Sequence, residues 1–106
     1  MKKRFLVPSD LGNEAKAFMR KILSDFELED RHYRVLLVAA QSLDRIFEAR
    51  AIVKQEGLTT TDRYGTAKAH PAVKIEQDSR LTFIRALREL GLDLQGTEAL
   101  RLPRQY

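Results

Sequence analysis

The feature that most constrains this chain is a stretch without glycine or proline, residues 31–56. Its apolar side chains recur at three- and four-residue steps from Tyr33 to Ala51, the spacing of one helical face. The acids of residues 27–30 suit a helix start, and Gly57 suits a helix end. Such a helix would measure about 39 Å, against a radius of gyration of about 13 Å for a compact domain of this size. We therefore predict a very long central helix over residues 31–56.

Residues 35–40 of this helix, Val-Leu-Leu-Val-Ala-Ala, are apolar around the whole circumference and must be covered on every side. Two partner helices of one thin domain hardly provide that cover, so we expect burial against other copies in a symmetric homo-oligomer. A core helix wrapped by its own chain is the alternative. The predicted interface residues are Val35, Leu36, Val38, Ala39, Leu43, Ile46 and Phe47.

Two further helices are predicted, over about residues 13–26 and 71–90. Asp10 or Asn13 could cap the first, and Pro71 opens the third. We place Ile75 on the inner face of the third helix, and expect Glu76 and Arg80 to pair on its outside. The break over residues 57–70 combines β-branched threonines with turn residues, and fits a short β-hairpin or an ordered loop.

The fold class expected from these elements is all-α, with three helices in one domain over residues 1–92. Residues 93–106 contain Gly96 and Pro103, and we expect an irregular or partly disordered tail there. No apolar run approaches the length of a membrane span, and the run after the basic N-terminus is too short for a signal-peptide core. These features favour a soluble intracellular protein.

Residues suited to catalysis or metal binding are scarce. The chain has no cysteine, and its two histidines, His32 and His70, are far apart, so each is expected to be structural or solvated. There is no phosphate-binding GxxxxGK[ST] loop, and Asp44 with Glu48 fits a solvated helix face. We predict no catalytic residue, no metal site and no cofactor, and therefore a protein that is not an enzyme.

The net charge of +4 weakly favours a polyanionic partner, and residues 1–26 carry six bases against three acids. Three of these bases lie opposite the apolar face of the first helix, where either solvation or DNA contact would explain them. Arg63, Lys68 and Arg101 are weaker candidates. The predicted DNA-binding residues are Lys2, Lys3, Arg4, Lys16, Arg20 and Lys21.

Three segments together resemble the phage terminase small-subunit family over roughly residues 28–93. A glycine, a short spacer and His70-Pro71 open a helix, which closes on a Leu-Gly-Leu end at residues 90–92; residues 43–58 resemble the family's second helix and its exit. The family often has a proline soon after the Leu-Gly-Leu element, whereas Asp93-Leu94-Gln95 follows here.

The resemblance implies a ring-like oligomer that binds viral duplex DNA and regulates or recruits the large ATPase and nuclease subunit during packaging. The implied location is the cytoplasm of a bacterial host. Two other classes stay open. One is a helix-turn-helix regulator, although residues 31–56 are too apolar for a recognition helix. The other is a structural helical module of a virion that has no affinity for DNA.

Overall fold

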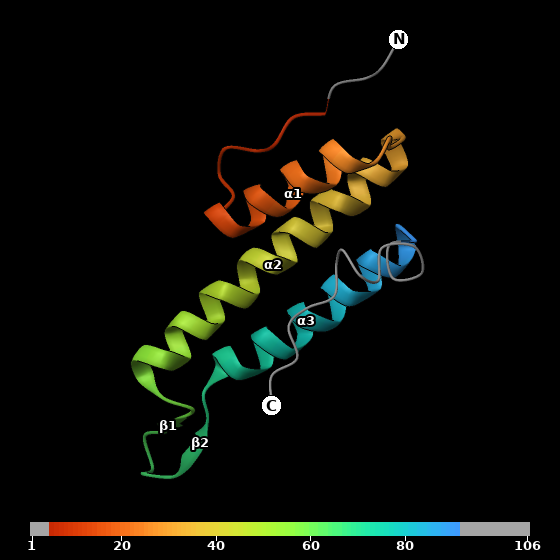
Figure 1. The fold of residues 1–106 in the computed structure, drawn as a ribbon. Coiled ribbons are helices and arrows are strands. Elements are labelled where there is room, and N and C mark those ends of the chain that lie inside the picture. Colours follow the sequence, from red (N-terminus) through yellow and green to blue (C-terminus); the bar gives the residue numbers. More distant parts are fainter. Residues whose placement is uncertain (1–4, 92–106) are drawn as a thin grey trace, which may run out of the picture.

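A computed structural model gives the structure of the chain and describes residues 5–91. Its elements are α1 (Asn13–Asp25), α2 (Asp30–Glu56), β1 (Thr59–Thr61), β2 (Ala67–Ala69) and α3 (Pro71–Glu89), shown in Figure 1. The mainly helical fold with a long central helix is therefore confirmed. Each helix boundary lies within one residue of the boundary expected. The tail expected over residues 93–106 lies outside the described residues.

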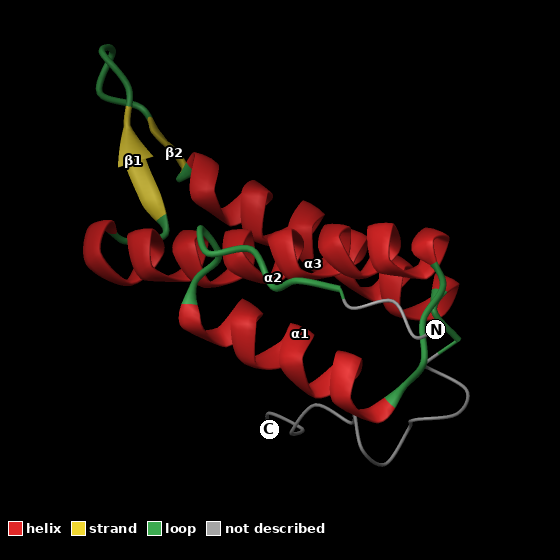
Figure 2. Ribbon diagram, turned by 90° about the horizontal axis from the view of Figure 1, so that it is seen from above, coloured by secondary structure: helices red, strands yellow, loops and turns green. Residues whose placement is uncertain are grey.

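Helix α2 is central, and both α1 and α3 pack against it (Figures 1 and 2). Helix α1 runs in the opposite direction to α2 along its first half, and α3 returns along α2 (Figure 1). Strands β1 and β2 pair antiparallel, with Thr60 opposite Lys68, and form a hairpin that projects past the ends of α2 and α3. Of the two possibilities for residues 57–70, a short β-hairpin and an ordered loop, the structure therefore shows the hairpin.

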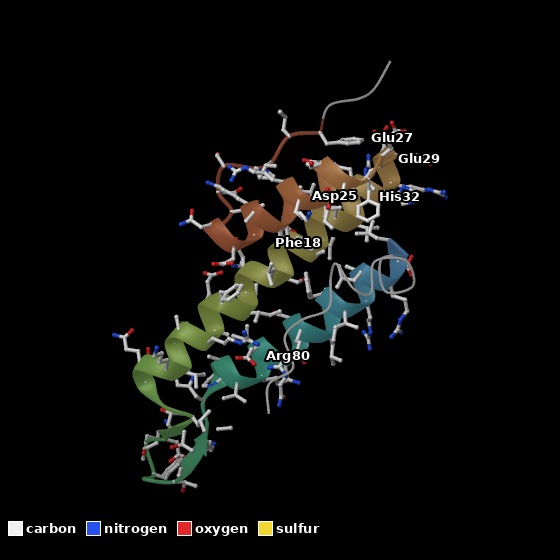
Figure 3. All side chains as sticks on the ribbon, in the orientation of Figure 1. Phe18, Asp25, Glu27, Glu29, His32 and Arg80 are labelled. Atoms are coloured by element: carbon white, nitrogen blue, oxygen red, sulfur yellow. The ribbon has the colours of Figure 1, made fainter. Side chains whose placement is uncertain are left out.

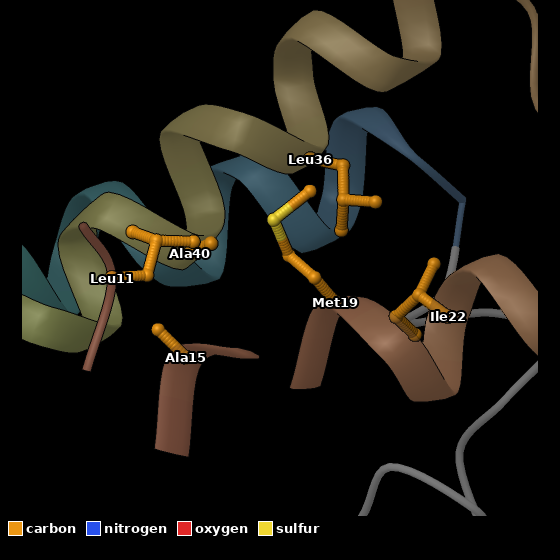
Figure 4. Packing of buried hydrophobic residues seen from close by; sticks show 6 residues of the cluster. All are labelled: Leu11, Ala15, Met19, Ile22, Leu36 and Ala40. Carbon is orange, nitrogen blue, oxygen red and sulfur yellow. The ribbon is translucent and has the colours of Figure 1, made fainter. Parts of the chain in front are cut away.

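The core fills the two seams between α2 and its neighbours. In the first seam, Met19 and Ile22 of α1 pack against Leu36 of α2, and all three are essentially inaccessible to solvent (Figure 4). In the second seam, Ala39 and Ile46 of α2 pack with residues of α3. Phe18 joins the seams, because its ring meets the ring of Phe83 edge-on at 5.4 Å between centroids. The hydrophobic core therefore runs across the first two thirds of α2.

The apolar segment of α2 is covered differently from our expectation. Leu36, Ala39 and Ala40 are completely buried within the single chain, so α1 and α3 do cover most of it. The small alanine side chains allow the helices to approach closely on those sides. Val38 lines the groove between α2, α3 and the loop before α1, and stays 45% exposed. The expectation that two helices hardly cover this segment is therefore wrong for Leu36, Ala39 and Ala40, whereas Val35 and Leu37 stay half-buried and Val38 stays exposed.

The start of α1 is stabilised by a residue from another helix. Gly12 is the N-cap and no side chain caps the helix, so the expected caps Asp10 and Asn13 are both wrong. Instead, the amide N–H of Gly12 donates to both carboxylate oxygens of Asp44 on α2, Oδ1 at 3.0 Å and Oδ2 at 3.1 Å. A Cβ atom on Gly12 would lie 2.8 Å from Asp44 Oδ1, so any larger residue there would displace the Asp44 carboxylate from its present position. Asp44 is therefore a tertiary contact rather than part of a solvated face.

Both histidines cap helices. His32 Nδ1 accepts the amide N–H of Glu29 at 3.3 Å, completing a reciprocal capping box at the start of α2, where Figure 3 labels both residues. His70 Nδ1 accepts the amide N–H of Ala72 at 3.0 Å at the start of α3. The other ring nitrogen of His70 lies 2.9 Å from Glu56 Oε1, at the end of α2. Each histidine was predicted to be structural or solvated, and these contacts give both of them a structural role.

Two residues of α3 differ in position from our expectation. Ile75 was expected on the inner face, but its side chain is 48% exposed. Glu76 does pair with Arg80, but it also accepts a hydrogen bond from Arg50 Nε of α2 at 3.3 Å. Its side chain is only 19% exposed, because it lies between the helices rather than on the outside.

Candidate nucleic-acid interface

The three candidate bases of α1 do not form one patch. Lys16 and Arg20 are four residues apart and share one side of the helix, with Arg20 exposed and Lys16 half-buried. Lys21 is one residue further, about 100° around the helix. Its ammonium group lies 2.9 Å from Asp25 Oδ2 in an i,i+4 ion pair. The structure therefore brings together two of the three bases and places the third beside an acid.

The other predicted DNA-binding residues, Lys2, Lys3 and Arg4, lie outside the described residues. The segment that follows them is held on the start of α2. Phe5 stacks on Tyr33 at 4.6 Å between ring centroids, and the Tyr33 hydroxyl donates to the carbonyl of Leu6. Aromatic stacking and this hydrogen bond fix where the described chain begins relative to α2.

Several bases of α2 and α3 are engaged with acids. Arg45 pairs with Glu48, and Lys74 lies 3.6 Å from Asp78. Arg50 pairs with Glu76 and also lies over the Phe47 ring, 5.9 Å from its centroid. These contacts lower the excess positive charge that the helical surface presents to a polyanion.

The hairpin carries two of the weaker candidates, Arg63 and Lys68. The Arg63 guanidinium lies over the Tyr64 ring, 5.0 Å from its centroid, and the Tyr64 side chain is 77% exposed. The Lys68 ammonium lies 3.5 Å from Asp62 Oδ2. Arg101, the third weak candidate, lies outside the described residues. Sequence reasoning missed Tyr64, although an arginine and a tyrosine side by side in turn residues were a signal of an exposed pair.

Asp62 organises the turn between the strands. Its Oδ1 atom accepts the amide N–H groups of Thr66 at 2.9 Å and Tyr64 at 2.8 Å. The hydrogen bond from the Thr66 amide, followed by those from the Tyr64 amide and the Lys68 side chain, outweighs desolvation and lowers the pKa of Asp62 below its ordinary value. Gly65 completes the turn with φ +81°, a left-handed conformation that favours glycine.

The predicted oligomer interface is only partly accessible in the single chain. Leu36, Ala39 and Ile46 are buried in the core, and Val35 and Leu43 are half-buried. Val38 and Phe47 are exposed. Sequence reasoning missed a further set of apolar side chains that α2 and α3 expose: Ile52, Ile75, Leu81 and Ile84.

An arrangement for catalysis is not found in the described part of the chain. No group of three or more residues among 5–91 could hold a metal ion. An open groove of about 730 Å³ lies between α2, α3 and the loop before α1. Its charged lining is four acids and one base, Asp10, Asp44, Glu48, Asp78 and Arg45, and neither histidine lines it. Within residues 5–91, no helix is both long enough and apolar enough for a bilayer crossing.

Comparison with known proteins identifies a family. The model of a family described as "Phage terminase, small subunit" matches residues 21–105 of the chain. No curated protein and no solved structure matches it. The matched residues include α2, the hairpin and α3, whereas Lys16 and Arg20 precede them.

Proposed function

We propose a function from one established premise: the chain belongs to the phage terminase small-subunit family. The family match over residues 21–105 is the observation that carries the functional assignment, and it supports a role in packaging phage DNA. The protein we propose is a packaging adaptor without enzymatic activity. It binds viral duplex DNA and regulates or recruits the large ATPase and nuclease subunit, in the cytoplasm of a bacterial host.

Contact with DNA is supported by the side of α1 that carries Lys16 and Arg20. Basic side chains on such a surface bind phosphates with little dependence on sequence and with strong dependence on salt. Lys21 and the three N-terminal bases complete the proposed set. A single chain of net charge +4 is only mildly attractive to DNA, but copies related by symmetry would add their fields.

Assembly into a homo-oligomer is supported by the apolar side chains that stay exposed. Phe47 and Val38 are 40% and 45% exposed on α2, and Leu81 is 52% exposed on α3. Contact with another protein surface would remove these apolar side chains from water, which favours association. We propose a closed ring of copies, in which the half-buried Val35 and Leu43 also approach the interface.

The regulator alternative receives no support from the arrangement of α1 and α2. In a helix-turn-helix unit the two helices cross at about 90–120°. Here α1 runs back along α2, and the face of α2 beneath it is packed with core residues (Figures 1 and 4). The other alternative is a virion module without affinity for DNA, and the following experiment tests it.

The experiment has two stages and uses the full chain. Light scattering on a sizing column at low and moderate salt measures the mass, and a single species of several subunits at both salts is expected. The wild type and a variant with Lys16→Ala and Arg20→Ala are then each titrated with duplex DNA at several salt concentrations. For every phosphate that the variant no longer binds, the slope of log K against log salt should fall in magnitude by about 0.9.

The matched control for this titration is Arg45→Ala, which removes an exposed base paired with Glu48 on α2. We expect it to leave the salt slope unchanged. A 12.2 kDa monomer would contradict the oligomer. An oligomer that does not bind DNA at low salt would favour the virion module. Capture of the large subunit of the same phage by the immobilised protein tests recruitment separately.

A further inference from the structure

The hairpin is the part of the described chain that the proposed function leaves unexplained. All six residues of its strands are exposed, and its tip lies beyond the ends of α2 and α3 (Figures 1 and 2). An isolated two-stranded hairpin is at best marginally stable in water. This hairpin therefore adds nothing to the core and depends on local contacts for its shape.

Its base is fixed to the helices by backbone hydrogen bonds. The amide N–H of His70 donates to the carbonyl of Leu58 at 2.7 Å, and that of Gly57 donates to Val53 at 2.7 Å. The contact of His70 with Glu56 links the two helix ends beneath the strands. The direction in which the hairpin leaves the helices is consequently defined.

Its tip is fixed by Asp62. Besides the two amide groups that its carboxylate accepts, the Asp62 amide N–H donates to the Thr66 carbonyl at 3.0 Å, and the Gly65 amide donates to the Asp62 carbonyl at 3.0 Å. Four hydrogen bonds thus shape a turn that has no hydrophobic core beneath it. The tip presents Arg63 and Tyr64 in one arrangement before any ligand binds.

The exposed chemistry of the hairpin suits a nucleic acid. A guanidinium group already placed over an aromatic ring loses little conformational freedom when it contacts a phosphate or the edge of a guanine. Threonine hydroxyls are common phosphate partners, and β1 consists of three threonines. The strand register places Thr60 opposite Lys68, so one face of the ribbon carries a hydroxyl and an ammonium group together. The ammonium group lies 3.5 Å from Asp62 Oδ2, and its side chain is 64% exposed, so a phosphate can approach it from the solvent side.

The shape of the hairpin agrees with this chemistry. The major groove of duplex DNA admits a two-stranded β-ribbon. The residues opposite Thr59 and Thr61 are the alanines Ala69 and Ala67, so the other face of the ribbon is thin. The centre of a protein–protein interface is depleted of charged residues and rich in large apolar ones, whereas Leu58 and Tyr64 are the only exposed large apolar residues within the hairpin.

We propose that the hairpin is a second DNA contact, in which Arg63 and Tyr64 at the tip and Lys68 on β2 enter a groove of the duplex and contact the phosphates along it. This inference rests on the DNA binding proposed above but assigns it to a different end of the molecule. In a ring, one hairpin from each copy would supply the same two cations. Their contribution then multiplies with the number of hairpins that reach the DNA.

The test is a titration of the full chain with duplex DNA at several salt concentrations. Arg63→Ala together with Lys68→Ala removes both cations and leaves Asp62, Gly65 and Thr66 to hold the turn. For each hairpin that contacts DNA, the slope of log K against log salt should fall by about 2 in magnitude, about 1 for each phosphate contact. Circular dichroism and the thermal midpoint should match the wild type.

Two variants that keep the positive charge at residue 63 separate the effect of charge from that of shape. Arg63→Lys keeps the charge but loses the planar group, so the affinity should fall while the salt slope stays unchanged. Tyr64→Ser removes the ring beneath the guanidinium and should have the same kind of effect. The matched control is Lys74→Ala, an exposed base on α3 paired with Asp78, which should change neither quantity.

The outcomes distinguish this inference from the proposed function. A wild type that does not bind DNA would overturn the DNA binding in both. A wild type that binds DNA with an affinity and salt slope that the hairpin variants leave unchanged would overturn the hairpin contact alone. Variants that keep DNA binding but no longer capture the large subunit would show the hairpin to be a protein contact, and would also overturn it.

Discussion

The two halves of α2 differ in how much of their surface the rest of the chain covers. The first half lies between α1 and α3, and Leu36, Ala39 and Ala40 are completely buried there. The second half has α3 alone beside it, and no residue of α2 after Ala49 is buried. It leads into the hairpin, whose strands are exposed throughout. One end of the molecule supplies stability, and the other end presents side chains that stability does not need.

This difference is typical of proteins in which a rigid body positions a binding element. Side chains in a packed core are constrained by volume, whereas those of an exposed turn are free to meet a ligand. The hairpin has backbone and turn hydrogen bonds in place of a core. The consequence is that substitutions at the two ends should separate stability from binding.

The largest effect is expected for Met19→Ala, in the seam between α1 and α2. Removing a fully buried methionine side chain leaves a cavity and should lower the free energy of unfolding by about 2–5 kcal/mol. Leu58→Ala, at a position 67% exposed in the hairpin, should change it by less than about 0.5 kcal/mol. Urea unfolding at one protein concentration measures both. Equal losses would contradict the division between a packed end and an exposed end.

A smaller loss is expected for Asp44→Ala, which removes the carboxylate from the start of α1. By analogy with loss of a capping side chain, the free energy of unfolding should fall by about 1 kcal/mol. Glu48→Ala, one turn further along α2, removes only the exposed pair with Arg45 and serves as the control. Chemical denaturation with helix content as the signal compares the two. No difference between them would show that the contact with Gly12 is unimportant.

At the hairpin base, His70→Ala should cost about 0.5–1 kcal/mol because α3 loses its N-cap. His70→Asn provides a matched comparison, since asparagine caps helices well but does not reach Glu56 as the imidazole does. We expect the asparagine variant to recover most of the stability. Thermal unfolding of the three proteins ranks them. An asparagine variant as unstable as the alanine variant would assign the effect to the Glu56 contact instead.

The smallest effect is local and depends on pH. The lowered pKa of Asp62 means that its charged form is favoured in the folded turn, so its contribution is complete above the ordinary value of 3.8. That contribution is lost as the pH falls through the lowered pKa. Amide chemical shifts of Tyr64 and Thr66 should therefore titrate with a midpoint below 3.8, and Asp62→Asn should abolish the titration. A midpoint at or above 3.8 would contradict the hydrogen bonds to Asp62.

Much of the fold followed from local patterns in the sequence. Apolar spacing, Gly57 and Pro71 located the helix boundaries to within one residue, because helix start and stop signals act over a few neighbouring residues. The candidate site was harder to predict. Lys16, Arg20 and Lys21 all lie away from the core face of α1, but only the structure separates Lys21 from the other two by pairing it with Asp25. The stack of Arg63 on Tyr64 depends on the turn geometry, which residue types alone leave open.

The sequence by itself determined where the helices lie, that α2 is long and apolar, and which family the chain belongs to. The tertiary structure decided how α2 is covered and which polar residues act at a distance. Asp44 reaches Gly12 across 32 residues, and Arg50 reaches Glu76 across 26. Such contacts depend on the packing of one helix on another, which no local pattern encodes. For the same physical reason, the sequence predicted that α2 is buried, but only the packing showed that α1 and α3 of the same chain bury much of its apolar segment.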